Sequence, residues 1–347
     1  MKKILFTGGG SAGHVVPNIA LMDDLLTTGK AEVCYMGTDG IEKRLLSGKN
    51  IPYYTISCPK LIRGGGLAGL KNNLRIPWAF FKAVKNAQKG LELLRPDVVF
   101  SKGGYVALPV VFAAKRLRIP CYAHESDFSP GLANRLSASK CQKTFTSFPE
   151  TAKRLRRGEY SGAPMRRSVL YASKAAARSS MDIPPNRKTL LVFGGGSGSQ
   201  AINDAVRAQL KKLTEKYLVL HVCGKGNLIE SNAKNYRQFE YIASMGKAYA
   251  CADVVVSRSG AGAVFELMCL KKPTLFVPLE GQTRGDQIEN AEYFQKKGLC
   301  RILWQSSLSR LSECVDETFE DKALRQRLAA SHITPANERI IRELLRP

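Results

Sequence analysis

Each half of the 347-residue chain begins with a short apolar run that ends in glycines. The first run ends in Gly8-Gly9-Gly10-Ser11-Ala12-Gly13, and the second ends in Gly194-Gly195-Gly196-Ser197-Gly198. A strand that turns at glycines into a helix is the opening unit of a doubly wound α/β domain. We therefore expect two such Rossmann-like domains, facing each other across a cleft where strand ends and helix starts converge.

After each glycine turn, apolar runs alternate with stretches of helical spacing. The runs are apolar throughout, which indicates strands of a parallel sheet covered on both faces. The expected strands are Ile4–Thr7, Val33–Gly37, Asp97–Ser101, Pro120–His124, Lys143–Ser147, Thr189–Phe193, Leu218–Cys223, Phe239–Ile242, Asp253–Val256, Thr274–Pro278 and Cys300–Leu303. The expected helices are Val16–Leu26, Leu74–Leu94, Val106–Arg116, Pro130–Ser139, 199–213, 261–271, 286–297 and 308–331.

The domain boundaries follow from a change in this pattern. Residues 151–187 are basic, rich in Ala and Ser and contain Gly162-Ala163-Pro164, so we interpret them as a connection between domains. The expected domains are an N-terminal domain at 1–161 and a C-terminal domain at 162–333. Residues 334–347 are expected to form a helix that packs back on the N-terminal domain.

The charge of the chain is strongly positive. Lys and Arg number 53 against 29 Asp and Glu, a net charge of +24, which attracts nucleic acid, acidic membranes or phosphorylated ligands. Residues 60–89 hold seven basic residues and no acid, interleaved with Leu67, Leu70, Leu74, Trp78 and Phe81. This mixture suits an anionic membrane surface. An ordinary helix with one buried and one basic face is the alternative, and no nucleic-acid motif accompanies the charge.

Cysteine spacing and hydropathy indicate the cellular compartment in which the protein works. The nine cysteines include no Cys-x-x-Cys pair, so we expect reduced thiols rather than a zinc or redox site. No apolar run reaches the roughly 20 residues that a spanning helix needs, and the N-terminal run is too short for a signal peptide. The sequence predicts a cytoplasmic protein that is soluble or attached to a membrane surface.

The first glycine cluster matches the Gly-x-Gly-x-x-Gly fingerprint of dinucleotide sites, but only weakly. The acid expected after the second strand is absent, since Met36-Gly37-Thr38 stands there and Asp39 comes late. The lysine of an ATP-binding loop is also missing. A phosphate bound at the helix N-terminus and a tight turn without ligand both fit. His14, where the loop enters its helix, is a candidate general base, or a cap or core histidine.

Two further groups of polar residues follow predicted strands. His124-Glu125-Ser126-Asp127 follows a strand of the first domain and precedes Asn134 on the next helix. In the second domain, Ser259-Gly260-Ala261 precedes a helix with Glu266, whose carboxylate could accept two ribose hydroxyls or be solvated. The chain has no Asp-x-Asp pair for a metal-bound diphosphate, so helix N-termini and Arg166 are expected to meet that charge.

Taken together, these motifs resemble the MurG family of UDP-N-acetylglucosamine transferases over nearly the whole chain. The matching segments are Gly9-Gly10-Ser11-Ala12-Gly13-His14, Ser101-Lys102-Gly103-Gly104-Tyr105-Val106, His124-Glu125, Gly131-Leu132-Ala133-Asn134, Gly162-Ala163-Pro164-Met165-Arg166, Ser257-Arg258-Ser259-Gly260-Ala261 and residues 287–291. The resemblance implies a GT-B fold, inverting sugar transfer without cofactor or essential metal, and peripheral attachment to the cytoplasmic face of the cell membrane.

The resemblance also implies roles for single residues. His14 and Glu125 would be catalytic, and Gly10, Tyr105, His124 and Asn134 would bind the acceptor. The implied donor-binding residues are Ser11, Ala12, Gly13, Asp127, Arg166, Gly195, Gly196, Ser197, Ile242, Ser259, Gly260, Ala261, Gly262, Ala263, Glu266, Asp286, Gln287 and Asn290. The chain departs from the family at Ser126-Asp127, where the family often has Gln-Asn, and at Gly196, where it has Ser.

The implied reaction is transfer of N-acetylglucosamine from UDP-N-acetylglucosamine to the 4-hydroxyl of undecaprenyl-diphosphate-linked N-acetylmuramoyl-pentapeptide (lipid I), which gives lipid II for peptidoglycan. Implied partners are that acceptor, the anionic inner leaflet, and proteins of cell-wall synthesis or the divisome, but not nucleic acid. One alternative is a glycosyltransferase acting on a diacylglycerol-type acceptor. Another is a nucleotide-sugar or nucleic-acid binding protein without turnover.

Overall fold

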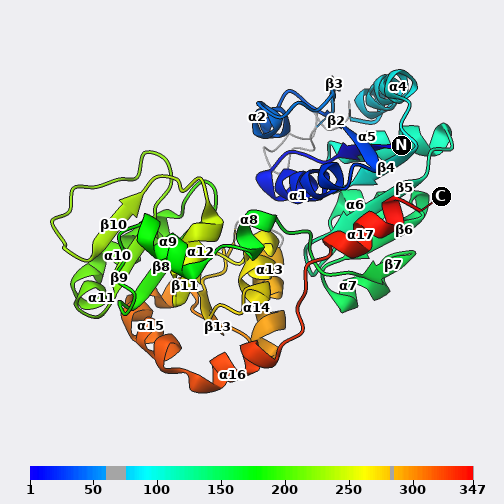
Figure 1. Cartoon of the computed structure of the whole chain (residues 1–347). Helices are drawn as coiled ribbons and strands as arrows, with labels where there is room; N and C mark the ends of the chain where they lie inside the picture. The colour runs from blue at the N-terminus through cyan, green and yellow to red at the C-terminus, as the bar shows by residue number, and fades with distance from the viewer. Residues whose placement is uncertain (60–75, 282–284, 347) are drawn as a thin grey trace, which may run out of the picture. The chain divides into compact units, whose positions relative to one another are not determined.

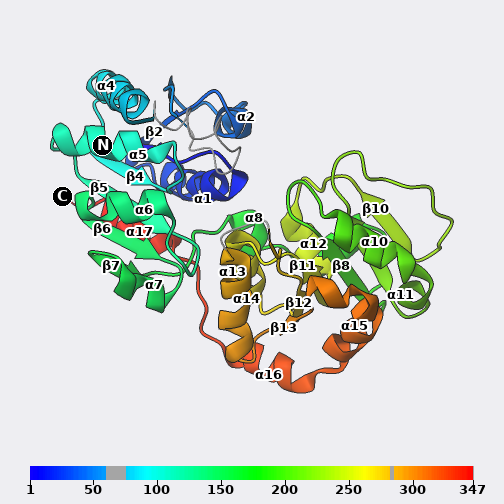
Figure 2. The same cartoon turned by 180° about the vertical axis from the view of Figure 1, so that it is seen from behind.

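The structure, a computed structural model, describes residues 1–59, 76–281 and 285–346. The chain divides into two compact units, one formed by Met1–Arg166 with Pro335–Pro347 and the other by Arg167–Thr334. Each unit is a parallel sheet with helices on both faces (Figures 1 and 2). Gly162, Ala163 and Pro164 belong to the first unit, although the expected boundary lies before them.

The first unit has a seven-stranded sheet in the order β3-β2-β1-β4-β5-β6-β7. Its strands are β1 (Lys2–Thr7), β2 (Ala31–Gly37), β3 (Tyr53–Thr55), β4 (Val98–Ser101), β5 (Cys121–Glu125), β6 (Lys143–Thr146) and β7 (Gly158–Tyr160). Its described helices are α1 (Ala12–Thr28), α2 (Ile41–Leu46), α4 (Ile76–Leu94), α5 (Ala107–Arg116), α6 (Leu132–Ser137), the short η1 (Ala138–Lys140), α7 (Pro149–Arg154) and α17 (Asn337–Leu344).

Alternate residues of these strands fill two cores, because side chains of a strand point to opposite faces in turn. Ile4 and Phe6 of β1 lie in a core with α1 and α17. Leu5, between them, lies in the core formed with α4 and α5. Both faces of the sheet are therefore buried, which explains why its central strands are apolar throughout.

The C-terminal helix α17 completes the first unit. Its Ile340, Ile341 and Leu344 lie in the same core as α1. Asn337, at its start, donates from Nδ2 to Asp24 Oδ2 at 2.6 Å and accepts from the backbone N–H of Met165 at 2.8 Å. These buried polar contacts fix the end of the chain to the segment that leads out of the first unit.

The second unit has a six-stranded sheet in the order β10-β9-β8-β11-β12-β13. Its strands are β8 (Thr189–Phe193), β9 (Leu218–Val222), β10 (Tyr236–Phe239), β11 (Val254–Ser257), β12 (Thr274–Phe276) and β13 (Arg301–Ile302). Its described helices are α8 (Arg167–Leu170), α9 (Lys174–Ser180), α10 (Gln200–Ala208), α11 (Leu210–Lys216), α12 (Met245–Cys251), α13 (Ala261–Cys269), α14 (Asp286–Lys296), η2 (Gln305–Arg310), α15 (Leu311–Glu320) and α16 (Lys322–Ala330).

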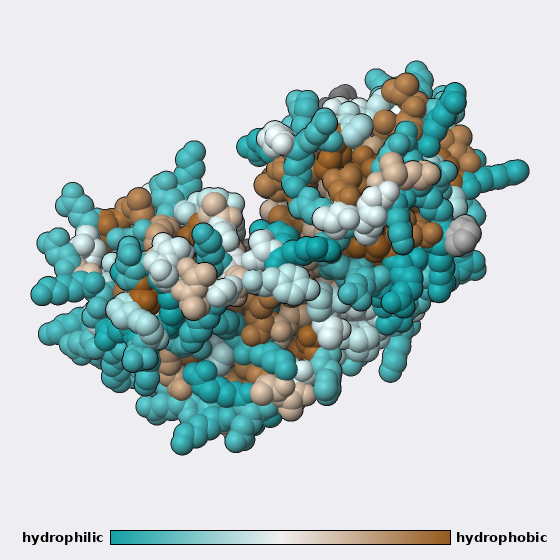
Figure 3. Space-filling model, viewed as in Figure 1, coloured by the Kyte–Doolittle hydropathy of each residue, from teal (hydrophilic) through white to brown (hydrophobic). Residues whose placement is uncertain are grey.

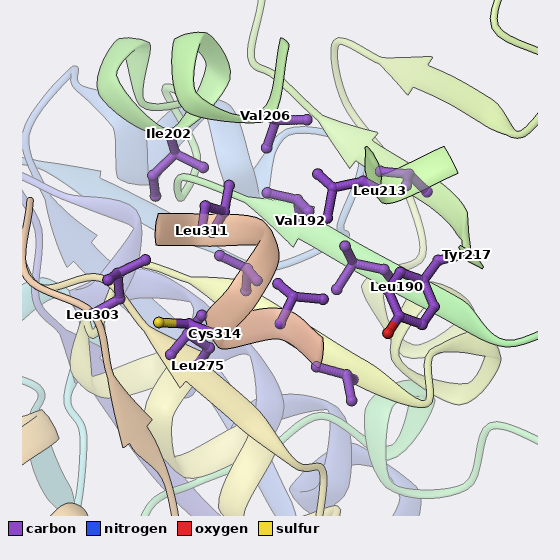
Figure 4. Close-up of a cluster of buried hydrophobic side chains, with 14 of the residues drawn as sticks. Leu190, Val192, Ile202, Val206, Leu213, Tyr217, Leu275, Leu303, Leu311 and Cys314 are labelled. Atoms are coloured by element: carbon purple, nitrogen blue, oxygen red, sulfur yellow. The ribbon is translucent and has the colours of Figure 1, made fainter. Parts of the chain in front are cut away.

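One core of this unit lies between the sheet and helices α10, α11 and α15. Figure 4 shows Leu190 of β8 beside Tyr217 and Val192 of the same strand on the side of Val206, in a core that also includes Ile202 of α10 and Leu311. Leu311 begins α15 and is fully buried. The apolar side chains of β8 thus hold the helix that follows the second glycine cluster.

The segment expected to connect the domains, 151–187, contains the boundary between the two units, after Arg166, but it also contains β7, α8 and α9. β7 is a three-residue edge strand, too short to show a pattern. β10 spans Tyr236–Phe239, whereas we expected a strand at Phe239–Ile242; its polar Arg237 and Gln238 fit a strand at the edge of the sheet.

Two expected helices are broken. The helix expected at 199–213 is interrupted at Gln209. The one expected at 308–331 is divided into η2, α15 and α16, and Asp321 caps α16 by accepting from Leu324 N at 2.8 Å. A local cap of this kind interrupts an apolar pattern that otherwise continues.

All nine cysteines are free thiols, and seven of them are buried. Within the ranges that the structure describes, no helix combines the length and the apolar character needed to cross a membrane.

Candidate active site

The first glycine loop joins β1 to α1. Gly10 has a φ of +82°, which disfavours any residue with a side chain, and a Cβ there would lie 2.5 Å from Cε1 of Tyr105. Ser11 follows in an extended conformation as the N-cap of α1. The absence of a side chain at Gly10 therefore brings the loop and the half-buried Tyr105 into direct contact.

His14 lies in the first turn of α1 and is held in place by its neighbours. Its Nδ1 lies 2.9 Å from Ser11 Oγ. A Cβ at Gly104 would lie 3.3 Å from the same Nδ1, so a glycine there leaves room for the ring. When Nδ1–H donates to Ser11, Nε2 keeps a lone pair and can accept a proton. The geometry thus gives His14 the chemistry of a general base.

Glu42 supports the glycine loop from α2, and sequence reasoning missed it. Its carboxylate is fully buried and accepts from the backbone N–H of Thr38 at 2.8 Å and of Gly10 at 3.3 Å. A Cβ at Gly9 would lie 2.7 Å from this carboxylate. Asp39, the acid that the sequence places late after the second strand, is exposed and pairs with Lys43. The sequence signal that could have identified this support is Glu42 itself, the second acidic residue after the strand, three residues beyond Asp39.

Glu125 anchors the loop that follows β5. Its two oxygens accept from the backbone N–H of Asp127 at 3.0 Å, from that of Gly131 at 2.8 Å and from Asn134 Nδ2 at 2.9 Å. Glu125 and Asn134 are each 4% exposed. The structure brings these two predicted residues together, with the carboxylate ordering the loop around it.

His124, next to Glu125, is fully buried. Its Nε2–H donates to the carbonyl of Gly162 at 2.8 Å, and Asn134 Nδ2 donates to the His124 carbonyl at 3.2 Å. Burial and the nearby Lys102 hold the pKa of His124 well below its usual range, so the ring is neutral. His124 therefore ties β5 to the segment that leads to Arg166, a half-buried residue at the end of the first unit.

In the second unit, the glycine loop after β8 is open to solvent. Gly195 has a φ of +97°, and a Cβ at Gly195 or Gly196 would meet no atom within 4 Å. Ser197 is exposed beside them, and α10 begins three residues later, at Gln200. Open backbone before a helix N-terminus is the arrangement that accepts a phosphate.

The starts of α13 and α14 meet at the same sheet edge. Ser259 Oγ donates to the carbonyl of Gln287 at 2.8 Å, and Asn290 Nδ2 donates to the carbonyl of Ser259 at 3.4 Å. Glu266, on α13, is half-buried and accepts from Tyr249 OH at 3.0 Å. The structure thus joins Ser259, Gln287 and Asn290 directly.

Other residues predicted to bind the donor, such as Gly260, Asp286 and Ile242, also lie in the second unit. Gly260 is the N-cap of α13, and a Cβ at Gly260 or Gly262 would meet no atom within 4 Å. Asp286 begins α14, and its buried Oδ1 has no hydrogen-bond partner among the described residues. Ile242 lies in the loop between β10 and α12. An orphaned buried oxygen and open helix starts are features of a site that receives a polar ligand.

Comparison with known proteins shows the family to which the chain belongs. Residues 4–146 match the glycosyltransferase family 28 N-terminal domain, and residues 189–343 match the glycosyltransferase family 28 C-terminal domain. A protein of Clostridium perfringens is 42% identical over 326 residues, which cover 92% of this chain and 89% of the relative. Its name is UDP-N-acetylglucosamine--N-acetylmuramyl-(pentapeptide) pyrophosphoryl-undecaprenol N-acetylglucosamine transferase. The chain belongs to the MurG family.

Other relatives agree with this placement. A protein of Lachnospira eligens with the same name is 43% identical over 331 residues, 93% of this chain and 92% of the relative. The crystal structure of Acinetobacter baumannii MurG superposes with a TM-score of 0.76 at 27% identity, covering 99% of each chain. A UDP-GlcNAc 2-epimerase of Neisseria meningitidis, 17% identical with a TM-score of 0.69, shares the fold alone.

The chain is therefore a glycosyltransferase with the GT-B fold of two Rossmann-like domains, as the MurG resemblance implied. The residues predicted from that resemblance are grouped by unit. Gly10, Ser11, His14, Tyr105, His124, Glu125 and Asn134 lie at the carboxyl edge of the first sheet, and the residues from Gly195 to Asn290 at that of the second. The individual ligand contacts stay predictions.

Proposed function

We propose that the chain transfers N-acetylglucosamine from UDP-N-acetylglucosamine to the 4-hydroxyl of lipid I, with inversion at the sugar carbon, and so forms lipid II. The observation that carries the proposal is the activity named for its Clostridium perfringens relative. The geometry of both glycine loops supports it, because one loop holds a candidate base and the other presents open backbone at a helix start.

The proposed chemistry needs one proton transfer. His14 Nε2 takes the proton of the acceptor 4-hydroxyl, whose oxygen attacks the anomeric carbon of the donor. The bond from that carbon to the diphosphate breaks, and UDP leaves with the electron pair. Glu125, whose oxygens accept three hydrogen bonds, would act by holding the loop that carries Asp127 and the helix α6 that carries Asn134.

The donor would be bound by the second unit. Backbone N–H groups at Gly195 and Gly196 and the start of α10 would receive the diphosphate, since a helix N-terminus favours negative charge. Glu266 would accept the ribose hydroxyls, and Asp286, Gln287 and Asn290 would contact the sugar. Because the backbone meets the leaving charge, we propose that no metal is required; unchanged turnover in excess EDTA is expected.

We also propose that the enzyme works at the cytoplasmic face of the membrane through α4, supplying lipid II for wall growth and division. Trp78 and Phe81 of α4 are 71% and 47% exposed. Lys82 lies 5.7 Å from the Trp78 ring and Lys85 lies 4.8 Å from that of Phe81. Exposed aromatic rings beside lysines suit the interface of an anionic bilayer.

The rest of α4 is an ordinary amphipathic helix. Val84, Ala87 and Leu91 are buried in the core shared with α5. The alternative interpretation, an ordinary helix with one buried and one basic face, predicts such a buried face. Figure 3 shows hydrophobic and hydrophilic side chains interleaved on the part of the first unit that carries α4. Leu67, Leu70 and Leu74, also expected in the membrane patch, lie outside the described residues.

The acceptor is tested by competition. Purified protein receives labelled UDP-N-acetylglucosamine together with lipid I and a diacylglycerol in equal amounts. We expect label in the lipid I product alone. Label in a glycosyldiacylglycerol would transfer the proposal to the alternative acceptor, and binding of the donor without any transfer would favour a pure binding protein.

A further inference from the structure

Lys102 is a buried cation at the acceptor edge to which the proposed chemistry gives no role. It follows β4, which lies between β1 with the glycine loop and β5 with Glu125. Its side chain is 1% exposed, and no other lysine or arginine in the described part of the first unit is buried. A charged group is costly to bury unless its charge is compensated or used.

Lys102 makes one hydrogen bond through its side chain and another through its backbone. Its Nζ donates to Ser126 Oγ at 2.7 Å, and its backbone N–H donates to the Thr7 carbonyl at 2.8 Å. A Cβ at Gly8 would lie 3.0 Å from the Lys102 Cβ, so the side chain leaves the sheet directly beside the glycine loop. The pKa of Lys102 is lowered by burial, which is the largest cause, and the neighbouring carboxylates of Glu125 and Asp127 offset part of that shift and favour the charged form.

Three carboxylates share this edge. Glu42 is fully buried against Gly9 and Gly10, Glu125 is 4% exposed, and Asp127 is half-buried. Solvent screens buried charges poorly, so these carboxylates repel any anion that approaches the loop. The acceptor of the proposed function carries a diphosphate. Lys102 is the buried charge of opposite sign at this edge.

We propose that Lys102 offsets the carboxylates of Glu42, Glu125 and Asp127 and so allows the first unit to bind an acceptor that carries a diphosphate. The inference rests on the proposed function for the acceptor. Lys102 acts through its field rather than by contact, because its side chain is covered by protein. It is therefore a residue that determines acceptor specificity and not a catalytic residue.

The test measures binding of two soluble short-chain probes to the full chain. Both carry the N-acetylmuramoyl-peptide; one has the diphosphate and the other an uncharged spacer of the same length. Lys102→Met should weaken binding of the diphosphate probe about tenfold or more. It should change binding of the neutral probe by less than about twofold, and leave UDP binding by the second unit intact.

Removing a negative charge separates this role from a structural one. Asp127→Asn removes one carboxylate and should tighten binding of the diphosphate probe severalfold. The double variant Lys102→Met/Asp127→Asn should return to within about threefold of the wild-type affinity. Ser126→Ala, which removes the hydrogen bond and keeps the charge, is the matched control and should bind both probes as the wild type does.

Equal loss of both probes in Lys102→Met would overturn the inference, and so would unchanged binding of the diphosphate probe. If Lys102→Met does not fold, which UDP binding and circular dichroism would report, Asp127→Asn alone decides, and weaker or unchanged binding of the diphosphate probe contradicts the inference. A wild-type protein that transfers no sugar to lipid I would instead refute the proposed function, so the two failures are distinguishable.

Discussion

Ser11 Oγ lies 2.9 Å from Nδ1 of His14, within the first turn of the helix that follows the glycine loop. A hydroxyl at this distance orients the ring. When the hydroxyl accepts the Nδ1 proton, Nε2 is the basic nitrogen of the ring. The Ser11–His14 contact thus places the candidate base beside the glycine loop predicted from the sequence.

Replacing His14 tests its role as base. His14→Ala should lower kcat by about 100-fold to 10,000-fold, since a general base acts in the transition state. Affinity for UDP-N-acetylglucosamine should change much less, because His14 is not among the residues predicted to bind the donor. Steady-state kinetics and donor titration give both values. Ser11→Ala should have a smaller effect on kcat, and an equal loss of kcat and donor affinity in His14→Ala would argue against the base.

Glu42→Gln should destabilise the protein by about 1–3 kcal/mol, because the new amide group places a donor against the N–H of Gly10 or Thr38. Urea unfolding measures the change. Glu32→Gln is the matched control: Glu32 is 53% exposed and pairs with Lys3 at 3.3 Å, so its loss should cost less than about 0.5 kcal/mol. Equal effects of the two substitutions would show that Glu42 does not support the loop.

Glu266→Ala should weaken binding of UDP-N-acetylglucosamine about tenfold, because a ribose would lose the carboxylate that accepts its hydroxyls. Tyr249→Phe removes only the hydroxyl that donates to Glu266 and should alter affinity by less than about threefold. Calorimetric titration of the donor compares the variants. Unchanged affinity in Glu266→Ala would remove the ribose role.

His221 should make the second unit sensitive to acid. Its Nε2–H donates to Asn203 Oδ1 at 3.0 Å, and its Nδ1 accepts from Tyr236 OH at 2.8 Å. Burial lowers the pKa of His221 from 6.5 to about 4. The unfolded chain therefore binds a proton that the folded chain does not, and stability falls as pH drops from 6.5 toward 4, by about 3 kcal/mol from this group.

The measurement is the free energy of urea unfolding against pH. His221→Gln should be less stable near pH 7 but should lose less stability between pH 6.5 and 4 than the wild type. His332→Gln, at an exposed histidine, should keep the wild-type pH dependence. The same pH dependence in His221→Gln as in the wild type would contradict the assignment.

The membrane proposal predicts that Trp78→Ser/Phe81→Ser reduces binding to anionic vesicles about tenfold or more, because two interfacial rings are lost. Leu93→Ser is the control, since Leu93 is 72% exposed near the other end of α4. Vesicle sedimentation measures the bound fraction. Retained binding in the double variant would show that α4 is an ordinary amphipathic helix and does not attach the protein to the membrane.

Much of the fold could be predicted because the buried strands carry their own signal. Residues 4–6 of β1 are buried and apolar, as is most of β8, and each strand leads into a glycine cluster that marks the turn into the next helix. β3 and β7 could not be predicted, because three residues at a sheet edge show neither period nor hydrophobicity. β10 was misplaced because its Arg237 and Gln238 interrupt the apolar pattern, which a strand at the edge of the sheet tolerates.

The candidate site could be predicted where chemistry and spacing coincide, as at His14 and Glu125. Glu42 and Lys102 could not, because their roles depend on contacts with residues far away in the chain. Glu42 meets Gly10 from α2, and Lys102 meets Ser126 from the next strand. A sequence gives the positions of such charges but not which of them are buried together.

The most direct test of the account is sugar transfer itself. Purified protein is incubated with labelled UDP-N-acetylglucosamine and lipid I, and the lipid fraction is followed with time. We predict one labelled sugar per lipid I, joined in the β configuration to the 4-hydroxyl, with one UDP released, and almost no product with His14→Ala. No label in the lipid fraction, with donor still bound, would contradict the account.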